Sequence, residues 1–202
     1  MNLPNKLTLS RIILIPFFIA AFYAPFTGHY FVALAIFAIA SFTDFLDGNI
    51  ARKYNLITDL GKFLDPIADK VLVTSSLVIM VADPNNNVFT AILGKYNLGL
   101  ILGGIGVVII IARELVVSSL RMMAAKQGKV LAAEKIGKVK TFFTDVTLVV
   151  VLLASGLYEF SAATEAARII AIISLVGFGI SVLLTIISGV SYLVKNKEVF
   201  AE

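Results

Sequence analysis

The chain has 202 residues, of which 59% are hydrophobic, and it carries 17 basic and 13 acidic residues. Soluble domains usually contain roughly 45–50% apolar residues, so this composition excludes an ordinary soluble domain and indicates an integral membrane protein with one compact domain, residues 1–202. The sequence contains no cysteine, which excludes disulfides, thiolate nucleophiles and cysteine metal sites. The excess positive charge lies between apolar stretches, which favours anionic lipid or a phosphorylated substrate over nucleic acid as a partner.

Six apolar stretches approach the length of about 20 residues that a helix needs to cross a bilayer. In chain order they are Leu9–Pro25, Tyr30–Tyr54, Asp59–Ala82, Leu98–Lys126, Val130–Tyr158 and Thr164–Val194. The first stretch follows Lys6 and Arg11 as a signal peptide would, but Pro25 and Phe26 stand where a small-residue cleavage site should be. The sequence therefore predicts an all-α integral membrane protein with six transmembrane helices.

The basic residues near the ends of these stretches are distributed unevenly. Only Lys95 and Arg168 fall on one side of the predicted membrane, and the other side carries all the remaining Lys and Arg residues. Cytoplasmic loops carry the excess of Lys and Arg, so the richer side is predicted to be cytoplasmic. Both termini then lie in the cytoplasm, as an even number of spans requires.

Four aspartates gather at the predicted cytoplasmic ends of the second and third stretches. On the second stretch, helical spacing places on one face Asp44, Asp47, Gly48 and Ala51. On the third stretch, the same spacing aligns Gly61, Asp65 and Asp69. The small residues let the two faces meet and let a flat ligand approach the backbone. The pattern predicts a shared site lined by carboxylates.

Unpaired carboxylates at one place repel each other, so a divalent cation is expected among them. Oxygen ligands without His or Cys favour Mg²⁺, Mn²⁺ or Ca²⁺. One alternative is that these acids are solvated residues at helix ends, paired with Arg52, Lys53, Lys62 and Lys70. Another is a carboxylate-lined cation transporter, although a path through the bilayer should place acids at several depths rather than in one layer.

The spacing of these residues resembles the signature of the CDP-alcohol phosphotransferases, membrane enzymes that transfer a phosphatidyl or similar group from a CDP-linked donor to an alcohol. The matching pattern is Asp44-x2-Asp47-Gly48-x2-Ala51-Arg52-x8-Gly61-x3-Asp65-x3-Asp69. The stretch Pro4–Arg11 is similar to the short amphipathic segment at the start of this family. Ala112–Leu115, Arg121, Gly128 and Gly137–Thr141 are similar to the branch that makes phosphatidylglycerophosphate. One departure leaves other acceptors open, because the chain has Phe142-Phe143-Thr144-Asp145 where that branch has Gln shortly after Thr141.

The resemblance implies six membrane helices around a polar cavity open to the cytoplasm, commonly in a homodimer in the inner or plasma membrane. It implies two divalent cations, Mg²⁺ or Mn²⁺, at Asp44, Asp47, Asp65 and Asp69, with Asp69 also the general base. The CDP portion of the donor is expected at Thr8, Asp47, Gly48, Ala51, Arg52 and Gly61. Ordinary alternatives are close helix packing for the small residues, a positive flank for Arg52 and a helix N-cap for Thr8.

A second polar cluster lies at the end of the fourth stretch. Arg113 and Arg121 are two turns apart there, and facing them across a short connection are Lys135, Lys138 and Lys140. Two arginines can grip a phosphate through paired donors, which would suit an acceptor that carries its own phosphate. Arg113 follows an apolar run and needs a partner, so Glu114 either pairs with it or contacts another helix. The alternative is a basic patch for anionic lipid head groups.

Together these patterns predict transfer of a phosphatidyl group from CDP-diacylglycerol to sn-glycerol 3-phosphate, with acceptor binding by Arg113, Arg121, Lys135 and Lys138. Membrane lipids are the other expected partners, and no nucleic acid is expected. Serine, inositol phosphate or phosphatidylglycerol as acceptor is the alternative within the family.

Overall fold

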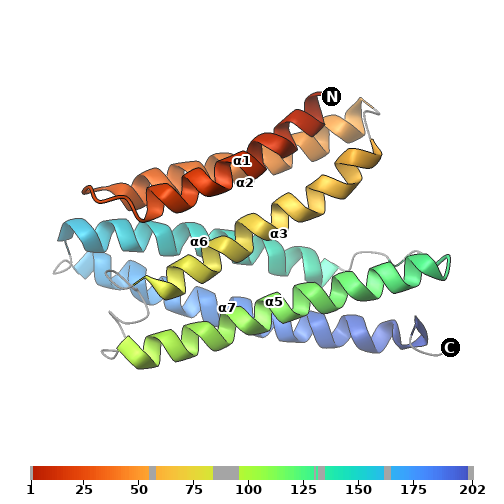
Figure 1. Cartoon of the computed structure of the whole chain (residues 1–202). Helices are drawn as coiled ribbons and strands as arrows, with labels where there is room; N and C mark the ends of the chain where they lie inside the picture. Colours follow the sequence, from red (N-terminus) through yellow and green to blue (C-terminus); the bar gives the residue numbers. More distant parts are fainter. Residues whose placement is uncertain are drawn as a thin grey trace.

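In the computed structural model every regular element of the described residues is helical, as predicted (Figure 1). The described residues are 2–54, 58–83, 96–129, 131, 135–161 and 165–199. Side chains are not described at 45, 47–49, 51–53, 59–60, 62–63, 65–66, 96–97, 135 and 161. The elements are α1 (Leu3–Phe22), α2 (His29–Lys53), α3 (Asp59–Ala82), α5 (Tyr96–Lys126), α6 (Lys135–Ser161), α7 (Glu165–Lys195) and the 3₁₀ turn η1 (Lys197–Val199).

Capping side chains set the starts of α1 and α3. The side chain of Asn2 accepts a hydrogen bond from the Asn5 backbone N–H at 3.2 Å, so α1 begins at Leu3 rather than at the predicted Leu9. The predicted N-terminal amphipathic segment therefore forms the first turns of α1. Thr58 caps α3 in the same way, because its Oγ1 accepts from the Gly61 backbone N–H at 3.0 Å.

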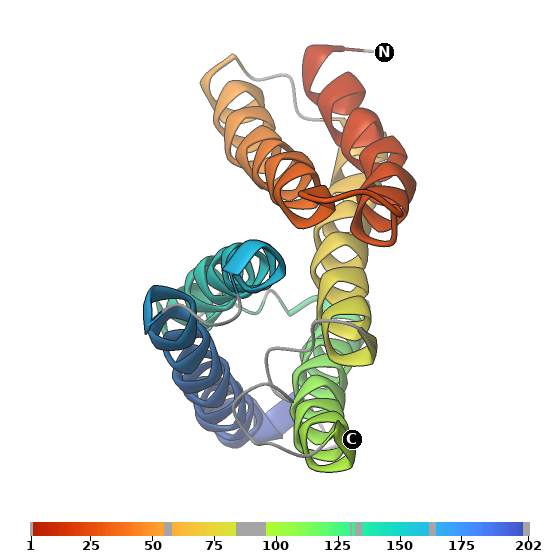
Figure 2. The same cartoon turned by 90° about the vertical axis from the view of Figure 1, so that its left-hand side faces the viewer.

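Each helix packs mainly against two others, in a ring whose order is α1, α2, α6, α7, α5 and α3. Figure 2 shows this ring from one end of the bundle. The start of α1 and the end of α7 lie at the same end of the molecule, on the right in Figure 1. The carboxyl ends of α2, α5 and α7 and the amino ends of α1, α3 and α6 also lie there. This arrangement agrees with the even number of predicted spans, and the cytoplasmic location of the termini stays a prediction.

Four helices of the described part are long and apolar enough to cross a membrane: Leu3–Phe22, Leu98–Lys126, Ile136–Phe160 and Glu165–Lys195. In α2 the apolar stretch His29–Asp44 is shorter. The protein is thus an integral membrane protein by the length and composition of its helices, and four of the six predicted spans meet that criterion.

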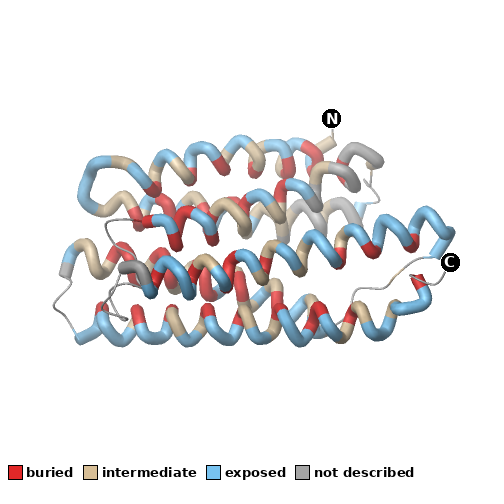
Figure 3. The backbone as a smooth tube through the Cα atoms, turned by 60° about the horizontal axis from the view of Figure 1, so that its bottom comes forward, coloured by how far each residue is buried: buried red, intermediate tan, exposed pale blue. Residues whose placement is uncertain are grey.

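The burial pattern of α7 is the reverse of that in a soluble protein. Its buried side includes Ser174, Ser181, Thr185 and Ser188, and large apolar residues such as Leu183 are exposed. Exposed residues follow the outer surface of the bundle in Figure 3. Small and hydroxyl side chains are enriched between membrane helices. Small residues let the helices approach closely, and hydroxyl groups form hydrogen bonds between the helices. This pattern fits a lipid-facing outer surface.

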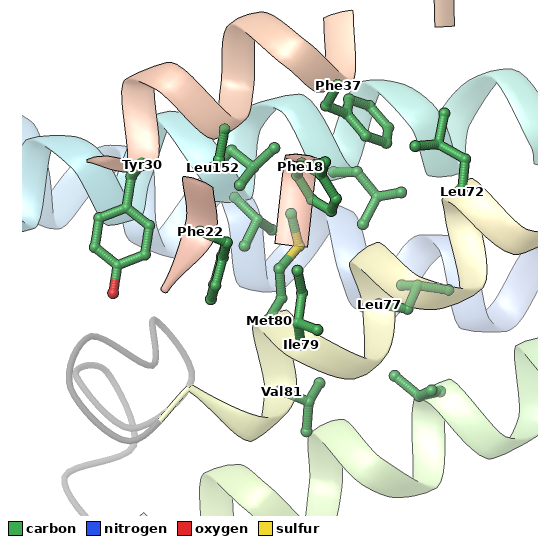
Figure 4. Close-up of a cluster of buried hydrophobic side chains, with 14 of the residues drawn as sticks. Phe18, Phe22, Tyr30, Phe37, Leu72, Leu77, Ile79, Met80, Val81 and Leu152 are labelled. Carbon is green, nitrogen blue, oxygen red and sulfur yellow. The ribbon is translucent and has the colours of Figure 1, made fainter. Parts of the chain in front are cut away.

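Most of the apolar core lies where α1, α2, α3 and α6 meet (Figure 4), and Ile110 of α5 and Phe178 of α7 extend it. The ring of Phe18 stands 5.9 Å from that of Phe37 and 6.4 Å from that of Phe22, between ring centroids. Leu152 of α6 is fully buried beside them. The core holds the helices in the order that brings their charged ends together.

Candidate active site

The two predicted metal ligands with described side chains are Asp44 on α2 and Asp69 on α3. The buried guanidinium of Arg11 approaches Asp44, with Nη1 2.6 Å from Oδ1. Arg11 also donates from Nε to the carbonyl of Ala40 at 3.2 Å, which holds its side chain against α2. This role of Arg11 was not predicted from the sequence, although an arginine at the start of an apolar helix needs a partner.

Asp69 is partly buried and lies where charges from several helices meet. It interacts electrostatically with Asp44 on α2, Arg11 on α1, Glu114 on α5 and Lys140 on α6. Asp44 and Asp69 are thus within electrostatic range of each other, which fits the predicted approach of the two carboxylates. The same interactions connect the predicted carboxylate site with the predicted basic cluster, which the sequence treated as separate.

The other carboxylates of the predicted metal centre, Asp47 and Asp65, have side chains outside the described part. Their backbone lies in α2 and α3, so the helical spacing on which the prediction rested is present. The described side chains alone contain no group of three or more His, Cys, Asp or Glu that could hold a metal ion. Asp44 and Asp69 offer oxygen ligands only, which fits a hard divalent cation. The two-cation centre remains a prediction.

Gly61 lies where α3 meets the first turns of α1. A Cβ at Gly61 would stand 2.9 Å from Asn5 Oδ1 and 3.2 Å from Thr58 Oγ1. Thr58 Oγ1 also donates a hydrogen bond to Asn5 Oδ1 at 2.9 Å, so these side chains have little freedom to move away. Close helix packing, one of the two interpretations of Gly61, is therefore confirmed. The proposed contact with the donor remains untested.

Thr8 is fully buried inside α1, where its hydroxyl donates to the carbonyl of Pro4 at 3.1 Å. The alternative that Thr8 caps a helix is wrong, because Asn2 is the N-cap. The remaining residues predicted to contact the donor, Asp47, Gly48, Ala51 and Arg52, have side-chain positions outside the described part.

Arg113 and Lys140 meet on a shared carboxylate. Glu114 Oε1 accepts from Arg113 Nη1 at 3.0 Å and from Lys140 Nζ at 2.6 Å. Both expected roles of Glu114 are thus confirmed, since it pairs with Arg113 and also ties α5 to α6. A Cβ at Gly189 would lie 3.0 Å from Arg113 Cγ, so this glycine of α7 makes room for the arginine stem. Arg113 Nε is buried and has no hydrogen-bond partner among the described residues.

The other basic residues of the predicted acceptor site lie in different surroundings. Arg121 Nε donates to Tyr192 Oη at 3.1 Å, and its guanidinium stands 5.6 Å from the centre of that ring. Lys138 is exposed. Residues two apart on a helix point roughly 200° apart, so Lys138 cannot face the neighbour that Lys140 contacts. The side chain of Lys135 is outside the described part. The structure brings Lys140 rather than Lys138 beside Arg113.

Comparisons with known proteins identify the family. Residues 1–187 match the CDP-alcohol phosphatidyltransferase family, and the chain belongs to this family. The chain is 36% identical, over 98% of its length and 96% of the relative's, to the CDP-diacylglycerol–glycerol-3-phosphate 3-phosphatidyltransferase of Bacillus subtilis strain 168. It is 42% identical to the protein of the same name from Escherichia coli strain K12, over 69% of this chain and 70% of that one. The predicted family is confirmed.

Proposed function

We propose that this chain transfers the phosphatidyl group of CDP-diacylglycerol to sn-glycerol 3-phosphate, giving phosphatidylglycerophosphate and CMP for phospholipid synthesis. The names of its relatives support this substrate pair. The observation that carries the proposal is the electrostatic interaction of Asp69 with Lys140 and Glu114, because Glu114 also binds Arg113. A carboxylate beside a basic cluster suits an acceptor with a hydroxyl to activate and a phosphate to bind.

In the proposed reaction, the terminal hydroxyl of glycerol 3-phosphate attacks the phosphorus of the phosphatidyl group. A new P–O bond forms, the bond to the CMP phosphate breaks, and the hydroxyl proton passes to a carboxylate oxygen of Asp69. Asp44, Asp47, Asp65 and Asp69 would hold two divalent cations, Mg²⁺ or Mn²⁺, which supply charge neutralisation at the phosphoryl oxygens when bound. Arg11 keeps the Asp44 carboxylate oriented through its ion pair. Phosphoryl transfer depends mainly on positioning and charge stabilisation, and such groups supply both.

In this proposal the two ends of the acceptor bind to different residues. Arg113 has a buried Nε without a hydrogen-bond partner in the described part of the chain, so it retains a donor for a phosphate oxygen. Lys140 adds a second positive charge 2.6 Å from the shared carboxylate of Glu114. The cytidine portion of the donor is proposed to contact Thr8, Gly48, Ala51, Arg52 and Gly61. Arg121, Lys135 and Lys138 are proposed to contribute positive charge at the rim.

The direct test is to incubate purified protein with CDP-diacylglycerol and one alcohol at a time, and to measure CMP release. Glycerol 3-phosphate should support turnover, whereas serine, inositol phosphate and phosphatidylglycerol should not. Turnover with serine at a similar rate would contradict the acceptor choice, because serine has no phosphate for Arg113. No CMP release with any alcohol, together with movement of divalent cations across sealed vesicles, would favour a transporter.

Replacing Arg113 by Ala should raise KM for glycerol 3-phosphate about ten- to a hundredfold, since a hydrogen bond to a charged group has that effect on affinity. KM for CDP-diacylglycerol should change little. Lys126→Ala is the matched control, because it removes one positive charge from an exposed position at the end of the same helix. Steady-state kinetics with each substrate varied in turn provide the measurement. An unchanged acceptor KM would assign Arg113 to helix packing through Glu114 instead.

We propose that both termini and the active site face the cytoplasm, in agreement with the distribution of Lys and Arg, and we expect a homodimer from the family resemblance. The chain has no cysteine, so the labelling of a single introduced cysteine reports its side of the membrane without background labelling of this protein. Cysteine at Thr27, in the exposed α1–α2 turn, should react with a membrane-impermeant maleimide on intact cells. Cysteine at Tyr54, exposed at the other end of α2, should react only after permeabilisation. The opposite labelling would invert the orientation.

A further inference from the structure

Asp145 on α6 is a carboxylate to which neither the sequence pattern nor the proposed reaction assigns a role. Its Oδ1 is buried and has no hydrogen-bond partner among the described residues. A buried polar oxygen without a donor carries a desolvation cost that no hydrogen bond among the described residues offsets. Such an oxygen is therefore available to a hydrogen-bond donor from outside the chain.

Asp145 lies within electrostatic range of both parts of the proposed site. It interacts electrostatically with Asp69 and Asp44 of the carboxylate group and with Lys140 of the basic cluster. The hydrogen bond of Lys140 goes to Glu114, at 2.6 Å. Asp145 therefore lies among acids and near a cation that already has a closer carboxylate partner. Ion pairing within the protein does not account for this position.

We infer that Asp145 accepts a hydrogen bond from the hydroxyl on the middle carbon of glycerol 3-phosphate, and so makes the enzyme specific for an acceptor with two adjacent hydroxyls. This inference rests on the proposed function. The acceptor has a phosphate at one end, a reacting hydroxyl at the other and a second hydroxyl between them. The protein has Arg113 and Lys140 for the phosphate, Asp69 for the reacting hydroxyl, and an unpartnered oxygen of Asp145 within electrostatic range of Lys140 and Asp69.

The test compares two acceptors that differ only in the middle hydroxyl: sn-glycerol 3-phosphate and 3-hydroxypropyl phosphate. The wild-type protein should prefer glycerol 3-phosphate about ten- to a hundredfold in kcat/KM, which is the effect of one hydrogen bond to a charged group. In Asp145→Ala this preference should fall to a few-fold, because only the acceptor with the middle hydroxyl loses a contact. Asp145→Asn keeps the shape and a neutral acceptor oxygen, so its preference should be intermediate.

Glu159→Gln is the control on the same helix. Glu159 lies near the opposite end of α6, where its Oε2 accepts from the Gly28 backbone N–H at 3.0 Å, a bond that Gln can also accept. This variant should keep the wild-type preference. Because the measured quantity is a ratio of two acceptors, a general loss of folded or active protein lowers both rates and leaves the ratio unchanged.

Binding of Mn²⁺, followed by electron paramagnetic resonance on the purified protein, separates the remaining outcomes. Mn²⁺ affinity of Asp145→Asn should stay within about twofold of the wild type if the residue contacts only the acceptor. Much weaker Mn²⁺ binding with an unchanged acceptor ratio would make Asp145 a cation ligand and overturn the inference. A wild type that uses both acceptors equally would also overturn it. A wild type that releases CMP with neither would instead overturn the proposed function.

Discussion

Complete removal of divalent cations should stop CMP release, and added Mg²⁺ or Mn²⁺ should restore it. The physical reason is that Asp44 and Asp69 lie within electrostatic range of each other at one end of the bundle, and Asp47 and Asp65 follow the same helical register. Without cations these carboxylates would repel both each other and the phosphates of the donor. The measurement is CMP release after treatment with excess chelator, with metal analysis of the treated protein.

Asp44→Asn is the informative variant for this prediction, because it leaves Arg11 in place and removes one ligand charge. Its half-saturating concentration of Mg²⁺ should rise strongly, and its turnover at low Mg²⁺ should be lost. Near-normal turnover of this variant at low Mg²⁺ would remove Asp44 from the ligand set. Full turnover of wild-type protein shown to be free of metal would refute the cation requirement altogether.

Asp69→Asn should lower kcat by about 10²- to 10⁴-fold, the usual contribution of a positioned general base. The amide keeps the size of the side chain but cannot take the proton of the attacking hydroxyl. Binding of CDP-diacylglycerol should persist, so the loss should appear in kcat far more than in KM for the donor. Rapid-mixing measurement of a single turnover would show the loss in the chemical step itself.

The control for Asp69→Asn is Asp83→Asn, the same change at the far end of α3. Asp83 is buried and accepts a hydrogen bond from the hydroxyl of Tyr30 at 2.5 Å, which an amide oxygen can also accept. This variant should retain most of the wild-type kcat. A comparable fall in kcat in both variants would indicate that any Asp→Asn substitution in this part of the protein lowers activity. It would contradict the assignment of Asp69 as the general base.

The helices were predictable where local chemistry marks their ends. The third stretch was predicted as Asp59–Ala82, and α3 has those bounds, because Thr58 caps its start and Pro84 closely follows its end. The first helix begins six residues earlier than predicted, at Leu3. The prediction from hydropathy left out the polar residues at the start of α1. The Asn2 cap and Pro4 in the first turn favour a helix that begins at Leu3.

The site was predictable within each helix but not between helices. Helical spacing correctly placed Asp44 on the second predicted helix and Asp69 on the third. It was also predictable that Arg113, which follows an apolar run, needs a partner. The choice of Lys140 over Lys138 beside Arg113, and the ion pair of Arg11 with Asp44, did not follow from spacing. These contacts depend on how each helix is rotated against its neighbours.

The sequence by itself determined the membrane class, the helical register of the carboxylates, the gathering of basic charge on one side and the family. The first three properties follow from composition and from the positions of residues along the chain, and the family follows from the resemblance of the pattern between Asp44 and Asp69 to its signature. The tertiary structure decided that Glu114 joins Arg113 to Lys140, that Gly61 and Gly189 admit close neighbours, and that Asp145 interacts electrostatically with both acidic and basic groups. The physical reason is that side chains from different helices meet only after packing sets the order and rotation of the helices, and a local pattern contains neither.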